Sequence, residues 1–316
     1  MDWAIIAAGL FMAWSIGAND SAKAVGIAVG SEILSFKRAI FLIGVFSLLG
    51  AFFGSSNVAH TVGSNIVPNF DKSYIPFALL ASALAVTFAS LRGLPISTTQ
   101  SIIGAIVGIG VYQKTYVNWS IVLKIALAWV VSPIAAAILS ILVFAIYGRI
   151  INHISKIYEI EVLYRWMIIL SSAYASFNLG ANELSNVIGL LTYSTNIEGN
   201  TLKLILALAL FFGALTFSYE VLMTIGKNLT QLGPLAGFSA QFGSALAVTS
   251  ANIIGLPVSS GQAIIGGIIG LGLLKGQKIN KKLTFNIVKG WVLAPLVSCL
   301  LTLLFIKIFS VLPLTF

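Results

Sequence analysis

The chain has 316 residues, of which 58% are hydrophobic and only 9% are charged, and its formal net charge is +9. Soluble domains carry roughly 25% charged residues, so this composition excludes an ordinary soluble protein and indicates an integral membrane protein. The basic residues are spread over short loops and do not cluster on one domain, which argues against binding to nucleic acid.

Apolar segments recur along the whole chain. A hydrocarbon core of roughly 30 Å needs about 20 helical residues. The run 121–146 is apolar on every side, whereas the strands of a membrane barrel would alternate apolar and polar residues. We therefore predict an all-α, polytopic membrane protein with segments at 3–30, 39–62, 75–91, 96–112, 118–147, 163–191, 202–225, 236–252, 258–274 and 284–312.

The second half of the chain repeats two polar motifs of the first half. The sequence GANDSA at 17–22 returns as GANELS at 180–185. The sequence GLPISTTQ at 93–100 returns as GLPVSSGQ at 255–262. An internal duplication with polar residues inside apolar segments is typical of secondary transporters.

The duplication predicts an inverted repeat. Ten of the fifteen positions in 83–97 are identical to those in 245–259. Each half crosses the membrane an odd number of times, whether all five of its segments span or the third and fourth form a re-entrant hairpin at the midplane. The second half then enters from the opposite side. We predict a first repeat at 1–147, a cytoplasmic linker at 148–162 and a second, inverted repeat at 163–316.

Loop charges predict the orientation. In this scheme Lys72, Lys114 and Lys203 lie on one face, and most other loop cations lie on the opposite face. By the positive-inside rule the richer face is cytoplasmic, so both termini are expected outside, and the compact length favours a prokaryotic inner (plasma) membrane. The cations of the cytoplasmic face are Lys37, Arg38, Arg149, Lys156, Arg165, Lys227, Lys275, Lys278, Lys281 and Lys282.

Two acidic residues lie deep inside apolar segments. A charged carboxylate such as Asp20 costs about 2.5–3.5 kcal/mol at the centre of a membrane helix. Gly17 and the Asn-Asp pair also weaken helix, so we expect a break that frees carbonyl oxygens beside the carboxylate. Oxygen ligands suit a small hard cation. The predicted cation ligands are Asn19, Asp20, Asn182 and Glu183. Alternatively, each acid neutralises a lysine such as Lys23, or stays protonated in a structural hydrogen bond.

The second motif has the complementary character. Pro95 interrupts helix, and the hydroxyl residues after it open a new apolar helix. Free backbone N–H groups, the helix dipole and hydroxyl donors at such an end favour an anion. The alternative is ordinary capping with nothing bound. The predicted substrate-binding residues are Ser97, Thr98, Thr99, Gln100, Ser259, Ser260, Gly261 and Gln262.

Both motif pairs resemble those of the inorganic phosphate transporter family, which includes bacterial phosphate carriers and sodium-phosphate symporters. That family carries a duplicated G-A-N-D element and a duplicated P-[VI]-S-T-T element, and the likeness extends over nearly the whole chain. The resemblance implies an inverted-repeat fold, phosphate binding at the hydroxyl residues, and cation coupling at the Asn-Asp and Asn-Glu pairs.

The sequence also departs from the family. Glu183 stands where the family usually has Asp, Gly261 replaces a hydroxyl residue, and Gln100 and Gln262 stand where many members have His. The second cation site is therefore rearranged or coupled to protons. Sulfate permeases are the nearest alternative. Phosphate carries a proton at pH 7, and Asp20 or Glu183 could supply an acceptor for it. We favour phosphate because the first half retains the Asn-Asp and Ser-Thr-Thr sequences.

These observations predict a secondary active transporter, not an enzyme, that imports inorganic phosphate by sodium symport, with proton symport second. Sulfate transport and an anion channel are the alternatives. The single Cys299 and the absence of a Cys or His cluster predict no cofactor beyond the coupling ion. The expected partners are the anion, sodium or protons, and the lipid bilayer. The sequence does not decide whether the protein forms a homo-oligomer.

Overall fold

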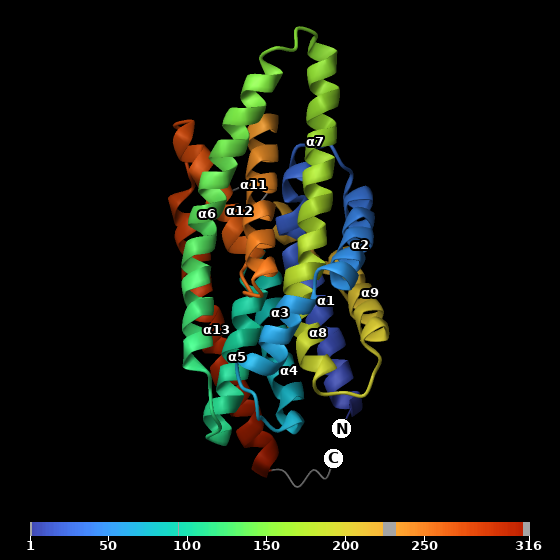
Figure 1. Cartoon of the computed structure of the whole chain (residues 1–316), viewed down its shortest axis with the longest axis vertical. Helices are drawn as coiled ribbons and strands as arrows, with labels where there is room; N and C mark the ends of the chain where they lie inside the picture. Colours follow the sequence, from blue (N-terminus) through green and yellow to red (C-terminus); the bar gives the residue numbers. More distant parts are fainter. Residues whose placement is uncertain (1, 94, 224–231, 312–316) are drawn as a thin grey trace.

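The computed structural model describes residues 2–93, 95–223 and 232–311. Within these ranges the chain forms α-helices with short 3-10 and π segments and contains no strand, which confirms the all-α class. The helices form an elongated bundle (Figure 1).

The first half begins with a long helix that carries the first polar motif. Two shorter helices follow, then a hairpin of two helices joined by the Pro95 loop, and finally the longest helix. These elements are α1 (Asp2–Gly30), α2 (Phe36–Phe53), α3 (Ser56–His60), η1 (Thr61–Asn65), η2 (Lys72–Tyr74), α4 (Ile75–Ser90), α5 (Thr98–Gln113) and α6 (Trp119–Ile151).

The second half runs through the same order of elements. Its first helix passes through a π turn at the second acidic motif, and its hairpin is joined by the Pro257 loop. The elements are α7 (Ile157–Asn178), η3 (Leu179–Glu183), α8 (Leu184–Thr192), α9 (Gly199–Phe217), α10 (Tyr219–Met223), α11 (Pro234–Ile253), α12 (Ser260–Leu274) and α13 (Lys281–Val311).

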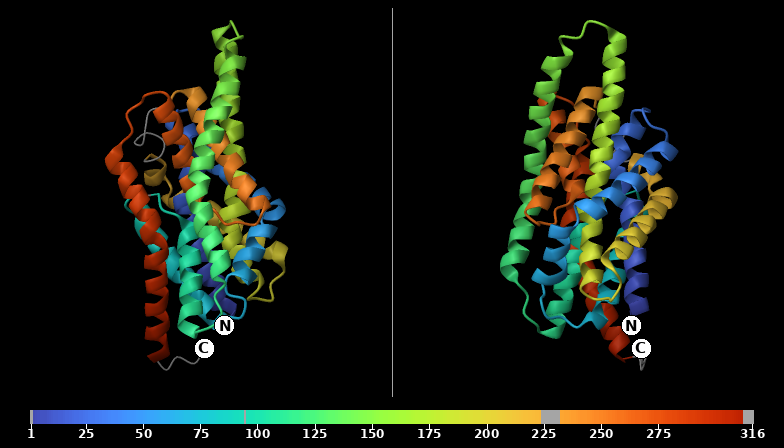
Figure 2. Two further views of the ribbon diagram at one scale, coloured as in Figure 1. Left: turned by 60° about the vertical axis from the view of Figure 1, so that its left-hand side comes forward. Right: turned by 45° about the vertical axis from the view of Figure 1, so that its right-hand side comes forward.

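The two helical hairpins lie in opposite halves of the bundle. In Figure 1, α4 and α5 occupy the lower half, whereas α11 and α12 occupy the upper half. The chain begins and α13 ends at the lower end, and the α6–α7 connection projects at the upper end (Figures 1 and 2). The arrangement is consistent with three crossings and one re-entrant hairpin per half, and with halves of opposite direction.

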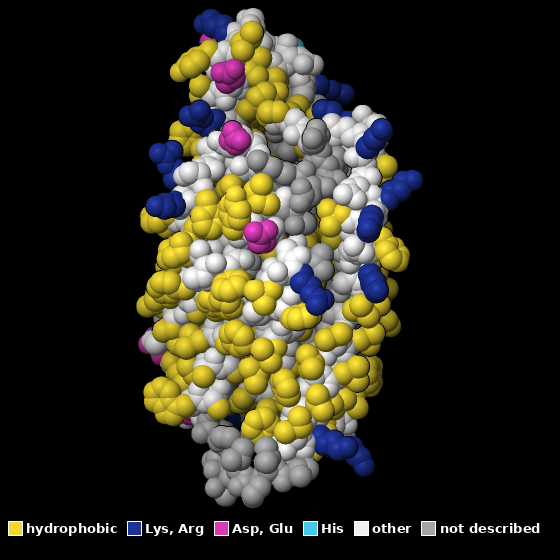
Figure 3. Space-filling view, turned by 180° about the vertical axis from the view of Figure 1, so that it is seen from behind, with side chains coloured by type: hydrophobic (Ala, Val, Ile, Leu, Met, Phe, Trp, Pro, Cys, Tyr) yellow, Lys and Arg dark blue, Asp and Glu magenta, His cyan; other side chains and the backbone are white. Residues whose placement is uncertain are grey.

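The outer surface is apolar where lipid would lie. Five helical regions are long and apolar enough to cross a membrane by length and composition: Phe36–Phe53, Lys72–Ser90, Trp119–Ile151, Gly199–Phe217 and Lys281–Ser310. On α6, exposed Leu127, Ile134, Ile138 and Leu142 follow a helical spacing, so one continuous apolar stripe faces outward. Figure 3 shows a broad hydrophobic band, with basic side chains gathered mainly toward the α6–α7 end. Lys227 lies outside the described residues.

Three details differ from the sequence prediction. The segment expected at 39–62 is divided at Gly54 into α2 and α3. The region expected as a linker at 148–162 is helical except for 152–156, so α6 and α7 extend further than predicted. The helix break expected near Asp20 is absent, and α1 continues through this residue. The nearby polar side chains bond to other segments and so do not compete for the backbone of α1.

Glycines allow the two halves to approach each other at the backbone. A Cβ added to Gly17 of α1 would lie 1.9 Å from the carbonyl oxygen of Leu210 on α9. The equivalent Gly180 would meet the carbonyl oxygen of Ser47 on α2 at the same distance. The same reciprocity holds for Gly104 against Pro295 and for Gly266 against Pro133, at 2.2 and 2.3 Å. Each half therefore packs on the other through matching contacts, as expected of a duplicated chain.

We predict that Gly17→Ala destabilises the protein, because the added methyl group meets backbone that cannot move away. Overpacking of this kind costs about 1–3 kcal/mol. Thermal unfolding in detergent should show a lower midpoint than in the wild type. Gly199→Ala is the matched control, because a Cβ there has no neighbour within 4 Å. Equal midpoints for the two variants would contradict the close contact between α1 and α9.

Candidate functional site

The two hairpin turns start their second helices at the predicted positions. Ser97 is the N-cap of α5, and its Oγ accepts a hydrogen bond from the Gln100 backbone N–H at 3.1 Å. Ser259 caps α12 in the same way, accepting from the Gln262 N–H at 3.3 Å. Both serines thus act as caps, as the alternative interpretation expected. A role for either one in anion binding stays a prediction.

Asp20 belongs to α1, and its side chain is fully buried against the start of α5. Its Oδ2 accepts a hydrogen bond from the Thr98 hydroxyl at 2.5 Å. Its Oδ1 accepts from the Lys23 ammonium, which also donates to the carbonyl oxygen of Ile96 at 2.8 Å. The lysine pairing that the sequence left open as an alternative is therefore present at Asp20, and the ammonium supplies the positive charge that the carboxylate needs.

Glu183 is equally buried but is surrounded by neutral donors. Its Oε1 accepts hydrogen bonds from the Ser260 backbone N–H at 3.0 Å and from the Ser260 hydroxyl at 2.7 Å. Its Oε2 accepts from Thr99 at 2.5 Å and lies 2.8 Å from the Thr98 hydroxyl. Within the described ranges Glu183 forms no ion pair. This carboxylate is therefore well hydrogen-bonded but has no adjacent positive charge of its own.

The Thr98 hydroxyl lies between the two acids. It is within hydrogen-bond distance of Asp20 and of Glu183, yet a hydroxyl group has only one proton to donate. Two carboxylates that contact one hydroxyl repel each other strongly in a site of low dielectric constant. An added proton or cation next to Glu183 would relieve this repulsion.

The two predicted asparagine ligands bind the hairpin turns. Asn19 accepts a hydrogen bond from the Ile96 backbone N–H at 3.2 Å and donates to the Ser90 hydroxyl at 2.9 Å. Asn182 donates to the Val258 carbonyl oxygen at 2.6 Å, and its Oδ1 lies 3.4 Å from the Val258 backbone N. These contacts satisfy backbone groups left free where each hairpin breaks, so both amides position the turns.

The remaining predicted anion ligands also lie in this buried region. The side-chain carbonyl oxygens of Gln100 and Gln262 are buried and have no hydrogen-bond partner among the described residues. Gly261 packs against Lys23, and a Cβ added there would lie 2.8 Å from the Lys23 Cε. The structure therefore brings all eight predicted anion ligands and all four predicted cation ligands to the two hairpin turns and their acidic partners.

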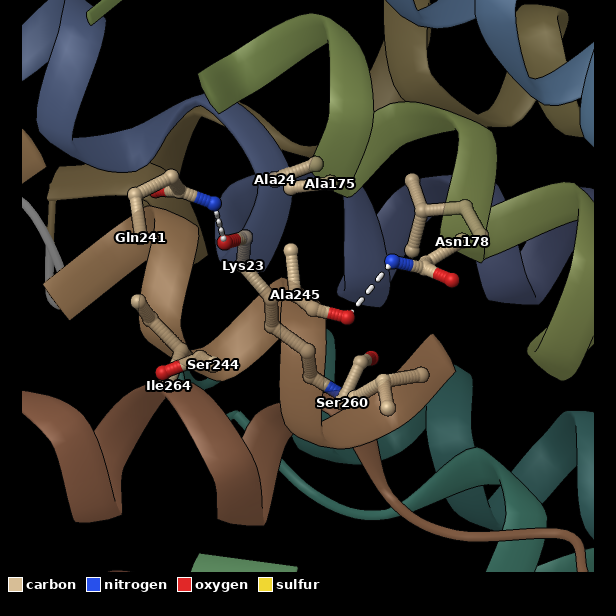
Figure 4. Close-up of a pocket in the computed structure, with 11 residues that line it drawn as sticks. Lys23, Ala24, Ala175, Asn178, Gln241, Ser244, Ala245, Ser260 and Ile264 are labelled. Atoms are coloured by element: carbon tan, nitrogen blue, oxygen red, sulfur yellow. Dashed lines mark hydrogen bonds between the residues drawn. The ribbon is translucent and has the colours of Figure 1, made fainter. Parts of the chain in front are cut away.

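A small cavity adjoins this cluster between α1, α7, α11 and α12 (Figure 4). Its volume is about 20 Å³, which holds roughly one water molecule. Its polar lining includes Lys23, Asn178, Gln241, Ser244 and Ser260. A tetrahedral oxyanion needs more space than this. Because several predicted hydroxyl donors are bonded to the carboxylates, an anion would have to displace those carboxylates or widen the site.

Sequence reasoning missed part of the site. Asn186 donates to the Thr99 hydroxyl at 3.1 Å and to the carbonyl oxygen of Glu183 at 3.1 Å. Lys23, named only as a neutralising partner, lies at the centre of the first acidic cluster. Aligning the two halves places Lys23 at the same motif position as Asn186, and that mismatch was a signal for both residues.

Comparisons with known proteins agree with the motifs. A family model described as "Phosphate transporter family" matches residues 16–302. A protein named "Putative phosphate permease" in Methanocaldococcus jannaschii is 32% identical, with 92% of each chain covered. A chloroplastic inorganic phosphate transporter of Arabidopsis thaliana is 26% identical over 98% of this chain and 72% of its own.

A solved structure shares the fold. It is named "The sodium-dependent phosphate transporter" and superposes with a TM-score of 0.88 at 23% identity, covering 98% of this chain and 99% of the other. Since the match extends over almost the full length of both chains, the helical arrangement is that of the solved protein.

We predict that Thr98→Val destabilises the protein more than the same change at a surface threonine. Valine keeps the shape of threonine but removes the hydroxyl that both carboxylates contact. Losing a buried hydrogen bond to charged groups costs about 1–3 kcal/mol. Thr216→Val is the control, because Thr216 is exposed and its hydroxyl bonds only to its own helix. Equal thermal unfolding midpoints would contradict the shared hydrogen bond.

Proposed function

This chain belongs to the phosphate transporter family, and we propose that it imports inorganic phosphate across the plasma membrane by cation symport, with sodium as the coupling ion. In this proposal residues 1–147 and 163–316 form two inverted repeats. The connection between α6 and α7 lies in the cytoplasm, and both termini lie outside. Movement of one repeat against the other alternately opens the shared site to each side.

The environment of Glu183 carries the proposal. A carboxylate inside a membrane protein marks an ion or proton pathway unless a fixed charge compensates it. Glu183 has neutral donors from α5 and α12 and, within the described residues, no ion pair. A sodium ion or a proton there would supply the missing charge. The sodium-dependent protein with the same fold supports the choice of sodium.

Cation binding at Glu183 would also prepare the anion site. While the carboxylate is uncompensated, it holds the hydroxyls of Thr98, Thr99 and Ser260. A cation bound to its oxygens weakens those hydrogen bonds and frees the hydroxyls for an oxyanion at the starts of α5 and α12. Uptake of the anion would then depend on the cation, which is the requirement for symport.

The same carboxylates favour phosphate over sulfate. Phosphate near pH 7 carries at least one proton and donates a hydrogen bond, whereas sulfate only accepts. Asp20 and Glu183 provide acceptors directly beside the hydroxyl donors. Sulfate would meet these negative charges without a proton to share.

We predict that the purified protein in proteoliposomes takes up labelled phosphate when an inward sodium gradient is imposed. Accumulation should exceed the outside concentration, and excess unlabelled sulfate should not suppress it. Suppression by sulfate, with uptake of labelled sulfate itself, would assign the chain to sulfate transport. Phosphate entry that only equilibrates across the membrane would indicate an anion channel.

We further predict that Glu183→Gln abolishes the response of phosphate uptake to sodium. The amide has a similar shape but no charge to bind a cation. Glu159→Gln is the control, because Glu159 lies exposed in an ion pair with Lys156 at the start of α7. Initial uptake rates at several sodium concentrations measure the effect, and size-exclusion profiles check folding. A Glu183→Gln protein with wild-type sodium dependence would rule out Glu183 as the coupling site.

A further inference from the structure

The two acidic clusters differ in a pair of matched positions. Asn186 follows the second acidic motif, and the corresponding residue after the first is Lys23. Thr99 belongs to the first proline motif, and the corresponding residue of the second proline motif is Gly261. The second acid therefore has an asparagine and a threonine beside it where the first acid has a lysine and a glycine.

The Thr99 hydroxyl and the Lys23 ammonium occupy equivalent positions in the two acidic clusters. Around Glu183, the Thr99 hydroxyl lies between the carboxylate at 2.5 Å and the Val258 carbonyl oxygen at 3.2 Å, with Asn186 donating to it. Around Asp20, the Lys23 ammonium lies between the carboxylate and the carbonyl oxygen of Ile96. Ile96 and Val258 occupy matching positions in the two proline motifs.

Gly261 is what makes room for the lysine. A Cβ at this position would lie 2.8 Å from the Lys23 Cε and 3.0 Å from its Nζ, so a threonine like Thr99 there would force the end of the lysine side chain out of its present position. Figure 4 shows the Lys23 side chain reaching from α1 to the start of α12 at Ser260. The lysine is 2% exposed, so its charge is compensated inside the protein.

We propose that the Lys23 ammonium is a fixed substitute for a coupling cation at the Asp20 site, so that only the Glu183 site exchanges an ion during transport. A carboxylate and a backbone carbonyl oxygen are ligands for a hard cation, and the ammonium takes both. A second positive charge at Asp20 would be repelled by the lysine at close range. The inference rests on the proposed cation symport and specifies how many ions it uses.

The test rebuilds the composition of the second site around the first acid. The variant Lys23→Asn/Gly261→Thr introduces at Asp20 the residue types that surround Glu183. In proteoliposomes, the ratio of labelled sodium to labelled phosphate taken up should rise by one sodium ion per phosphate relative to wild type. Adding Asp20→Asn to this variant should remove the extra ion. Lys156→Asn, which removes a lysine from an exposed ion pair, should keep the wild-type ratio.

An unchanged sodium-to-phosphate ratio in a transporting double variant would overturn the proposal. If, in addition, the KM for phosphate rose tenfold or more, Lys23 would be assigned as an anion ligand. Sodium binding to detergent-purified protein provides a second measurement that needs no transport by the double variant. On a wild-type background, Glu183→Gln should lose all sodium binding, and a remaining site that Asp20→Asn removes would also overturn the proposal.

Failure of the proposed sodium symport can be told apart from failure of the Lys23 proposal. Wild-type phosphate uptake that ignores sodium would refute sodium symport. Sodium binding by the double variant, absent from the wild type and removed by Asp20→Asn, would still support Lys23 as a substitute cation. No sodium binding by either protein would overturn it.

Discussion

One hydroxyl group shared by two buried carboxylates is the constraint on which the centre of this protein depends. Thr98 can donate its proton to Asp20 or to Glu183, but not to both at once. On an exposed surface, water would solvate the acid that does not receive the Thr98 proton, but here both acids are fully buried. Each one therefore needs a different partner. Asp20 has the Lys23 ammonium, and Glu183 has hydroxyl and backbone donors from α5 and α12. In the proposed symport, this difference makes Asp20 structural and leaves Glu183 available to bind the coupling cation.

The surrounding fold holds these groups in place through backbone contacts. Each hairpin stops at a proline loop inside the protein, and a membrane interior offers no water to the backbone groups freed there. Asn19 and Asn182 supply hydrogen bonds to the two loops from the acidic motifs, so each acid and its hairpin turn are tied together. Close approaches at Gly17 and Gly180 join each motif to a helix of the other half. A shift of one half against the other would therefore move Glu183, in the second half, relative to the Thr98 and Thr99 hydroxyls of the first half.

The sequence predicted the features that depend on local chemistry. Proline followed by a capping serine sets where α5 and α12 begin, and the duplication carried each prediction into the second half. The sequence did not predict that α1 stays helical at Asp20, since that depends on partners far along the chain. The division of the second segment at Gly54 was missed, although the polar residues Ser55, Ser56 and Asn57 follow it directly. The sequence also did not predict that the hydroxyls of Thr98, Thr99 and Ser260 bond to the two carboxylates and leave no open anion site among the described residues. These bonds follow from tertiary packing and cannot be read from either motif alone.

In the proposed symport, the lysine also changes the charge that the protein carries when it reorients without substrate. With both acids ionised, the site would carry two negative charges, and Lys23 reduces this to one. Charge within a membrane protein is unfavourable in proportion to how poorly it is compensated. A site with one net negative charge becomes neutral on binding one monovalent cation, and it returns to one negative charge when a phosphate monoanion joins. The empty and fully loaded forms then carry equal charge. Under the proposed alternating access, both forms would therefore change orientation against similar electrostatic barriers, as a symporter that returns empty requires.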